Sequence, residues 1–356
     1  MQDIMREIGS EYDLESNNNY IELDINQSFF KKAELFRSGR DALKAIAFRY
    51  KSLYNRIVLP ALCCESMVTP FIRNGYDVVF FKLNPDISAN AEDILSRLQH
   101  KDIFLYMNYF GVQSLSDEVL QQIKKIFPKT IMIEDKTHDI LSPRCNEFIP
   151  DYMVCSIRKW LAISDGGVLY TQGDTGYICK EYDPFFSDIR TNALRNKSDY
   201  LKSQNMNLKD LFRSQFEEAN EYLDKDKSIV GMSSKSYELL KRINFSKIAE
   251  VRFENIRILC QELKDIDQIK KIHSINANKI ALYYPIIVDS RNDVQQELAN
   301  NGIYCPVIWP LPKKAVGICE VSDYISSNML ALPCDQRYVA IDMVHISTIL
   351  KRIFGA

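Results

Sequence analysis

Short apolar runs alternate with amphipathic stretches through the first half of the chain. The apolar runs have the length and composition of strands, and they span residues 56–60, 77–81, 102–108, 130–135, 152–157 and 167–171. Residues 40–53 before the first run, and residues 63–74, 90–99 and 116–127 between later runs, are predicted to form helices, with Asn90 as an N-cap. This alternation predicts βαβ units and an α/β fold, in which helices cover both faces of a parallel sheet.

The pattern changes after residue 175. Residues 176–230 are polar with mixed charge, and residues 233–265 show the spacing of long amphipathic helices. A strand at 279–288, a helix at 291–301, a strand at 303–309 and a helix at 338–354 follow. We therefore expect an N-terminal arm over residues 1–28, a large domain over 29–244 and a small α+β domain over 245–356.

Composition and charge exclude several classes of function. With 356 residues, 46% hydrophobic and 26% charged, the chain resembles ordinary globular proteins and is long enough for two domains. A net charge of -2 favours neither a nucleic-acid surface nor a polybasic membrane patch. No apolar run reaches the roughly 18 residues of a membrane span, and the N-terminus lacks the pattern of a secretory signal.

The nine cysteines are scattered and include no CxxC pair. Several, such as Cys155, Cys260 and Cys305, sit in apolar stretches, as reduced and buried thiols do. Neither a zinc site nor any other metal site is expected, because no metal-ligand spacing occurs among the four histidines or the cysteines. The cytoplasm is the expected compartment.

The first candidate site is "SGRDAL", residues 38–43, at the start of the first predicted helix. Gly39 would let the backbone approach a ligand closely, and the free N–H groups of a helix start suit a phosphate. Ser38 would add a hydroxyl donor. The alternative is an ordinary serine N-cap followed by a glycine in the turn, which is the commoner arrangement.

The second candidate is "IMIEDKTHDI", in which Glu134 and Asp135 end an apolar strand and His138 follows. A buried carboxylate is costly unless it meets a cation or several donors, and a protonated pyridine nitrogen would be such a partner. Alternatively, Asp135 caps a helix and His138 is structural.

The third candidate is Lys159 in "VCSIRKWLAISDGGVLYT", three residues after Ser156 and before the Gly166-Gly167 turn. An amine that forms a Schiff base must lose its charge readily, which a partly desolvated site promotes. The alternative is a surface lysine on a connecting turn.

The order of these three candidates matters more than any one of them. A phosphate-binding turn, an acid at a strand end and a lysine after the next strand meet the needs of one cofactor, pyridoxal 5′-phosphate (PLP). Competing motifs are missing from the sequence: it has no GxGxxG after the first strand, no P-loop, no GxSxG elbow and no HExxH.

The same stretches resemble the DegT/DnrJ/EryC1/StrS family of sugar aminotransferases, within the fold-type I PLP enzymes. "LFRSGRDAL", "IEDKTHDI" and "SIRKWLAISDGGVLYT" match the phosphate turn, the acidic motif and the lysine segment of that family. The resemblance implies a seven-stranded, mostly parallel sheet with a small C-terminal domain. It also implies a homodimer with active sites at the subunit interface.

The resemblance also implies roles for individual residues. Lys159 would form the Schiff base, Asp135 would pair with the pyridinium nitrogen, and His138 would lie near the ring or its 3′-oxygen. The phosphate would be bound by Ser38, Gly39 and Ser156, and Arg40 in the same turn would also contact the cofactor.

Three features differ from the family pattern. Ser156 stands three residues before the lysine instead of five, no aromatic residue is evident near Cys64, and the partner-subunit motif survives only in outline at 230–240.

Two functions fit these observations. The first is an aminotransferase that moves an amino group from an amino acid, glutamate by expectation, to a keto sugar, free or nucleotide-linked, in polysaccharide or related biosynthesis. The second is a non-catalytic or regulatory binding protein on the same fold, or another PLP-dependent reaction. Arg40, Tyr109, Arg190 and Trp309 are further candidates for the substrate pocket; alternatively, they are solvent-exposed, core or interface residues.

Overall fold

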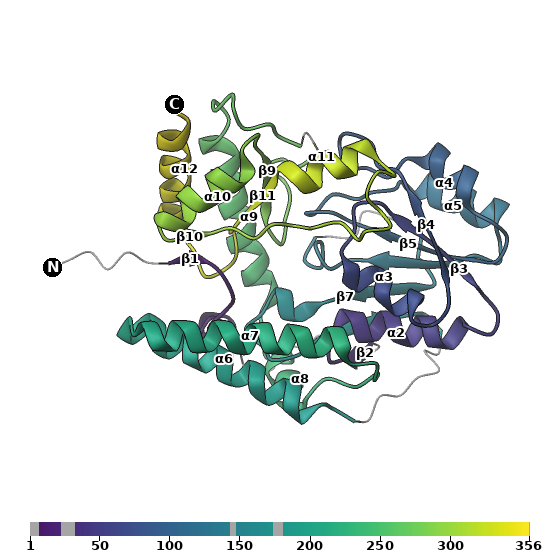
Figure 1. Ribbon diagram of the computed structural model, residues 1–356, viewed down its shortest axis with the longest axis horizontal. Helices are drawn as coiled ribbons and strands as arrows, with labels where there is room; N and C mark the ends of the chain where they lie inside the picture. Colours follow the sequence, from purple (N-terminus) through teal and green to yellow (C-terminus); the bar gives the residue numbers. More distant parts are fainter. Residues whose placement is uncertain (1–6, 23–32, 143–146, 174–180, 273, 356) are drawn as a thin grey trace.

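The computed structural model describes residues 7–22, 33–142, 147–173, 181–272 and 274–355. A seven-stranded sheet forms the centre, with strand order β2-β8-β7-β6-β5-β3-β4 (Figure 1). Its strands are β2 (Ala33–Phe36), β3 (Arg56–Pro60), β4 (Asp77–Phe81), β5 (Asp102–Met107), β6 (Ile131–Asp135), β7 (Tyr152–Cys155) and β8 (Gly167–Tyr170). β8 pairs antiparallel with both β2 and β7, and the remaining strand pairs of this sheet are parallel. The expected seven-stranded, mostly parallel sheet is therefore confirmed.

Helices connect the strands as the alternating pattern predicts. They are α2 (Gly39–Tyr50), α3 (Glu65–Ile72), α4 (Ala91–Arg97) and α5 (Asp117–Ile126). All six residues of β5 are buried, which explains its continuous apolar sequence: both faces of the sheet are covered there. The Asn90 side chain accepts a hydrogen bond from the Asp93 N–H at 2.9 Å, so the predicted N-cap of α4 is confirmed.

Two long helices occupy the polar segment for which no element was predicted. They are α6 (Pro184–Ser203) and α7 (Met206–Lys225), and they pack against each other along the lower edge of Figure 1. Phe212, Phe216, Ala219 and Leu223 form the buried stripe of α7, at a spacing of four, three and four residues. The mixed charges on the other faces of this helix hide that stripe in the sequence.

The C-terminal part combines helices with a short antiparallel strand pair. Its elements are α8 (Ser234–Leu240), α9 (Phe245–Glu262), β9 (Tyr284–Ile287), α10 (Arg291–Asn300), β10 (Ile303–Tyr304), α11 (Glu320–Asn328), β11 (Met329–Leu332) and α12 (Ala340–Phe354). β9 pairs with β11, and β10 pairs with β1 (Ile8–Gly9) from the other end of the chain. The proposed boundary near residue 245 falls at the start of α9.

Two predicted strands of this part are shorter than expected. The strand predicted over 279–288 is confined to β9. The carbonyls of Ala281 and Leu282 accept hydrogen bonds from the Arg252 guanidinium, each at 3.0 Å, and not from a neighbouring strand. The strand predicted over 303–309 ends at Tyr304, since Pro306 has no N–H to donate.

The N-terminal segment crosses to the C-terminal part through β1 and then forms a short turn, η1 (Asn18–Tyr20). Residues 1–6 and 23–28 of the proposed arm lie outside the described residues. Within the described ranges, none of the helices combines the length and apolar character needed to cross a bilayer.

Candidate active site

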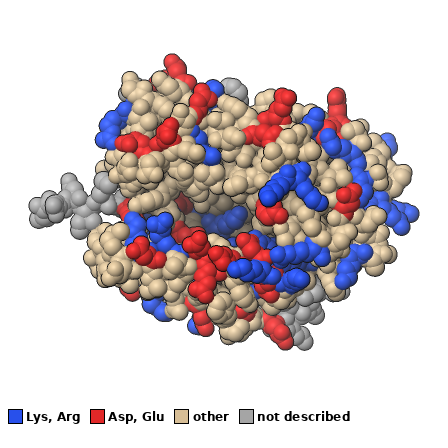
Figure 2. Space-filling model, in the orientation of Figure 1, with Lys and Arg blue, Asp and Glu red and all other residues tan. Residues whose placement is uncertain are grey.

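Two adjoining cavities open near the carboxyl ends of β6 and β7. Both are lined by Arg158, Lys159 and Trp309, so they meet at the lysine. The larger has a volume of about 680 Å³. Figure 2 shows the hollow on this face of the molecule, with basic side chains at its floor.

The structure brings the predicted site residues together. The smaller cavity is lined by Ser38, Gly39, Arg40, Asp135, Ser156 and Lys159, and His138 lines the larger cavity beside Lys159. These residues come from three separate stretches of the sequence, as expected for one site at a sheet edge.

The predicted phosphate turn lies between β2 and α2. Ser38 is the N-cap of α2: its hydroxyl accepts from the Asp41 N–H at 3.2 Å and donates to the Asp41 carboxylate at 2.8 Å. The ordinary N-cap considered as an alternative is thus present. A Cβ on Gly39 would lie 3.2 Å from Ser156 Cβ, so glycine lets the turn approach the lysine segment closely.

A buried ion network holds this turn in place. Arg37 contacts both oxygens of Asp41, at 2.9 and 3.0 Å, and also contacts Asp183 at 2.6 Å and Asp226 at 2.7 Å. Lys44 reaches Asp41 from the other side at 2.9 Å. The first turn of α2 is therefore tied to the beginning of α6 and to the end of α7. The sequence shows Arg37 only as one basic residue before the turn, which gives no sign of this network.

The Gly166-Gly167 turn passes directly beneath the phosphate turn. Gly166 donates its N–H to the Arg37 carbonyl at 2.7 Å, and a Cβ on Gly167 would overlap the carbonyl of Ser38. The neighbouring Asp165 is buried and binds both the N–H and the hydroxyl of Ser233, each at 3.0 Å. The 230–240 segment thus anchors this turn.

We expect Gly167→Ala to lower the free energy of unfolding by about 1–3 kcal/mol, because the added methyl group must displace the backbone of the phosphate turn. Urea denaturation of the purified protein measures this loss. Gly173→Ala is the matched control: the nearest atom to a Cβ there is the Thr171 hydroxyl, at 4.0 Å. Equal stability of the two variants would contradict the close approach of Gly167 to Ser38.

Asp135 ends β6 and is almost completely buried. Its carboxylate accepts a hydrogen bond from the Thr137 N–H at 2.8 Å, and no helix begins here, so the helix-cap alternative for Asp135 is wrong. Burial raises the pKa of Asp135, while its bonds to Thr137 and the charge of Lys159 oppose this. A neighbouring cation would stabilise the charged form of this buried carboxylate.

Thr137 is a positioning residue that the sequence analysis did not single out. Its hydroxyl accepts from the Ser156 N–H at 3.1 Å, and its carbonyl accepts from the Trp160 indole N–H at 2.7 Å. The acidic strand end is thereby joined to the lysine segment. Its place between Asp135 and His138 was the only signal in the sequence.

Lys159 ends the short turn η2 (Ile157–Lys159) that follows β7. The side chain is mostly buried, and burial lowers the pKa of its amine; Arg158 and Arg40 act in the same direction, while Cys64 and Asp135 oppose them. A larger fraction of the amine is therefore neutral, and hence nucleophilic, near pH 7.

His138 is fully buried and stacks at 5.1 Å from Trp309 and 4.8 Å from Phe110, measured between ring centroids. Burial, helped by the charge of Lys159, holds its pKa well below the usual range. Neither ring nitrogen has a hydrogen-bond partner among the residues that the structure describes. His138 is thus a neutral imidazole at the wall of the larger cavity.

The further pocket candidates divide into two groups. Trp309 and Arg40 line the cavities, whereas Tyr109 and Arg190 do not appear among the lining residues. Tyr109 lies in the core and donates its hydroxyl to the Leu62 carbonyl at 2.5 Å. Arg190 is buried on α6.

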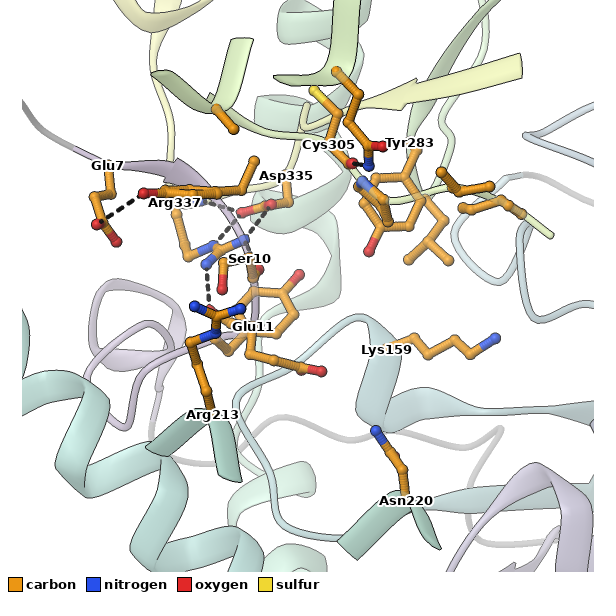
Figure 3. A pocket seen from close by; sticks show the side chains of 18 of the residues that line it. Glu7, Ser10, Glu11, Lys159, Arg213, Asn220, Tyr283, Cys305, Asp335 and Arg337 are labelled. Atoms are coloured by element: carbon orange, nitrogen blue, oxygen red, sulfur yellow. Dashed lines mark hydrogen bonds and ion pairs between the residues drawn. The ribbon is translucent and has the colours of Figure 1, made fainter. Parts of the chain in front are cut away.

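Several charges on the outer wall of the larger cavity are already paired. Figure 3 shows Lys159 extending on one side, away from a cluster formed by Asp335, Arg337 and the N-terminal segment. Arg337 contacts the two oxygens of Asp335 at 2.7 and 2.8 Å. Lys209 likewise pairs with Glu7 at 2.5 Å.

Comparison with solved structures identifies the fold. The aminotransferase PseC from Helicobacter pylori, involved in pseudoaminic acid biosynthesis, superposes with a TM-score of 0.66 at 14% identity, over 99% of this chain and 98% of that one. A DegT DnrJ EryC1 StrS aminotransferase from Brucella abortus gives 0.65 at 18% identity, over 95% and 92%. The chain has the fold of these aminotransferases.

This aminotransferase fold recurs in sugar aminotransferase CalS13 from Micromonospora echinospora, with a TM-score of 0.62 at 12% identity over 98% of this chain and 99% of that one. The chain matches no family model and none of the curated proteins. The fold expected from the sequence resemblance is confirmed, and at these identities the comparison establishes the fold alone.

Proposed function

We propose that this protein is a PLP-dependent aminotransferase that moves an amino group from an amino acid, by expectation glutamate, to a keto sugar, free or nucleotide-linked. The observation that carries the proposal is the meeting of Lys159, Asp135 and the start of α2 in one cavity. Support also comes from the Spr1654 protein of Streptococcus pneumoniae, which has this fold and was solved in a PLP form and a PMP form.

The residues of the smaller cavity fit PLP chemically. The amine of Lys159 has a lowered pKa, as a Schiff-base lysine requires, and the buried Asp135 carboxylate would meet a protonated pyridine nitrogen. The glycine turn at Gly39 and the cations Arg40 and Arg158 suit a phosphate. Three chemically different groups of one cofactor thus find partners in one cavity.

When bound, PLP supplies an aldehyde that condenses with amines and a ring that withdraws electrons. Lys159 would remove the proton from Cα of the donor amino acid and deliver it to C4′ of the cofactor, because a neutral amine can act as the base. Asp135 would hold the proton on the ring nitrogen throughout. His138 and Trp309 would keep water away from the reacting face. A homodimer belongs to this proposal, as does a role in polysaccharide or related biosynthesis.

The half-reaction with an amino donor tests this function. Protein mixed with PLP should develop a visible absorption band, and L-glutamate should bleach that band with release of one equivalent of 2-oxoglutarate. If no amino acid changes the band, the non-catalytic binding function is the better description. If no band develops at all, the cofactor assignment is wrong.

A further inference from the structure

The junction of the two cavities carries more positive than negative charge. The charged residues that line the smaller cavity are Arg40, Arg158, Lys159 and one carboxylate, Asp135. The Nε atoms of Arg40 and Arg158 are buried, and no hydrogen-bond partner for either exists in the described part of the chain. A buried guanidinium donor without a partner is costly, so these two side chains point to a missing acceptor.

Three other arginines that are buried or mostly buried, Arg37, Arg252 and Arg337, have partners for their guanidinium groups. Arg37 binds three carboxylates, and Arg337 binds Asp335 with two parallel contacts. Arg252 donates to Gln336 at 2.9 Å and to the Tyr12 hydroxyl at 2.8 Å, besides two carbonyls. The unsatisfied donors of Arg158 and Arg40 contrast with these three side chains, and both of them line the smaller cavity.

The surroundings of Arg158 make the deficit of negative charge larger. Arg190 lies close behind it, and the Nε and Nη1 atoms of Arg190 also have no partner within the described ranges. Burial, with repulsion from Arg190 and Arg40, lowers the pKa of the Arg158 guanidinium to about 9, although the charges of Glu11 and Asp41 oppose this shift. Among the described residues, Arg40 pairs with one carboxylate, Asp224, whose side chain is 65% exposed and therefore compensates its charge poorly.

The hydroxyl of Ser38, by contrast, is already used. It donates to Asp41 and accepts from the N–H of the same residue. The Asp41 carboxylate also sits in the first turn of α2, where it offsets the positive end of the helix dipole that would otherwise attract a phosphate. The helix start is therefore weaker as an anion site than its Ser-Gly sequence suggests.

We propose that Arg158, with Arg40 beside it, binds the phosphate of PLP in this protein, and that the Ser38 hydroxyl has only a small share in that contact. This inference rests on the proposed function and assigns to an arginine pair the role that the sequence pattern gives to serine. A guanidinium suits the task because its planar N–H groups can bind two phosphate oxygens at once.

The experiment compares two ligands that differ only in the phosphate, PLP and pyridoxal. Quenching of tryptophan fluorescence reports both dissociation constants, because Trp309 lines the two cavities. Arg158→Met should weaken PLP binding by about 30-fold or more, the loss expected for charge-assisted bonds, and should change pyridoxal binding by less than about 3-fold. Ser38→Ala should weaken PLP binding by less than about 5-fold.

Two controls separate this loss from a general effect. Arg195→Met removes the same charge from an exposed residue of α6, whose side chain donates a hydrogen bond to Asn192 and to no other described residue, and should change neither constant. Without cofactor, Arg158→Met should unfold at the same temperature as the wild type or higher, because it loses repulsion from Arg190. If Arg158→Met unfolds at a lower temperature than the wild type, Arg158→Lys is used in its place. That variant should still lose part of the preference for PLP over pyridoxal.

The inference would be overturned if Arg158→Met weakened the binding of PLP and of pyridoxal equally. It would also be overturned if Ser38→Ala weakened PLP binding more than Arg158→Met does. If the wild type binds neither ligand, the proposed function fails, and inorganic phosphate then tests the arginine pair alone. Phosphate should raise the melting temperature of the wild type but not that of Arg158→Met. Equal shifts in the two proteins, or none in either, would overturn the phosphate assignment.

Discussion

Replacing Lys159 with alanine is expected to lower the rate of the half-reaction with L-glutamate by about 10⁴-fold. The amine is the nucleophile of the proposed site and also the base that moves the Cα proton, so its loss removes both functions. Single-turnover release of 2-oxoglutarate, with PLP in excess, measures the effect. Lys159→Arg should lose as much, because a guanidinium keeps its proton near pH 7.

The matched control is Lys225→Ala, which removes an exposed lysine of α7 that pairs with Glu221. This variant should react at the wild-type rate. A Lys159→Ala rate within tenfold of that control would show that the amine does no chemistry. Full activity in Lys159→Arg would show that only its positive charge matters.

Asp135→Asn is expected to slow the same half-reaction by about 10²–10³-fold. An amide cannot stabilise a proton on the pyridine nitrogen as a carboxylate does. Loss of one partner of a buried ion pair costs about 3–5 kcal/mol, and much of this loss would raise the free energy of the transition state, which depends on an electron-poor ring. Asp139→Asn is the control: Asp139 is also buried but contacts Lys136 at 3.6 Å and does not line the smaller cavity. Equal losses in the two variants would argue against a pairing of Asp135 with the cofactor.

The stability of the cofactor-free protein gives an independent test of Asp135. Burial raises the pKa of this carboxyl in the folded state, so its charged form opposes folding. That cost is absent below the unfolded pKa of about 3.9 and grows as the pH rises through the folded pKa. Cofactor-free Asp135→Asn should therefore gain stability over the wild type as the pH rises from 4 to 8, while its reaction is slower. A gain that is independent of pH would contradict this.

Local sequence patterns predicted six of the seven strands, because burial on both faces leaves little ambiguity; they missed β2, in which only Phe36 is fully buried. β5 is apolar at nearly every position, and each strand from β2 to β5 is separated along the chain from the next by a helix. The pattern failed where burial depends on distant partners. The stripe on α7 is separated by charged residues, and the strand predicted over 303–309 ended early because Pro306 cannot pair.

The site could be predicted because its residues follow the ends of strands in a fixed order along the chain. Asp135 and Lys159 follow strands that the sequence predicts, whereas Ser38 was joined to them through the needs of one cofactor, because β2 before it was not predicted. The side-chain network around Ser38 could not be predicted from the sequence. Whether the hydroxyl of Ser38 faces a ligand or Asp41 depends on Arg37, whose partners Asp183 and Asp226 lie far along the sequence.

Covalent trapping tests the central claim most directly. Protein incubated with PLP is treated with borohydride, digested, and its peptides are mapped by mass spectrometry. We predict one reduced cofactor per chain, attached to Lys159, and no attachment in Lys159→Ala. A cofactor mass on another lysine, or none in the wild type, would contradict the claim that Lys159 anchors PLP in this cavity.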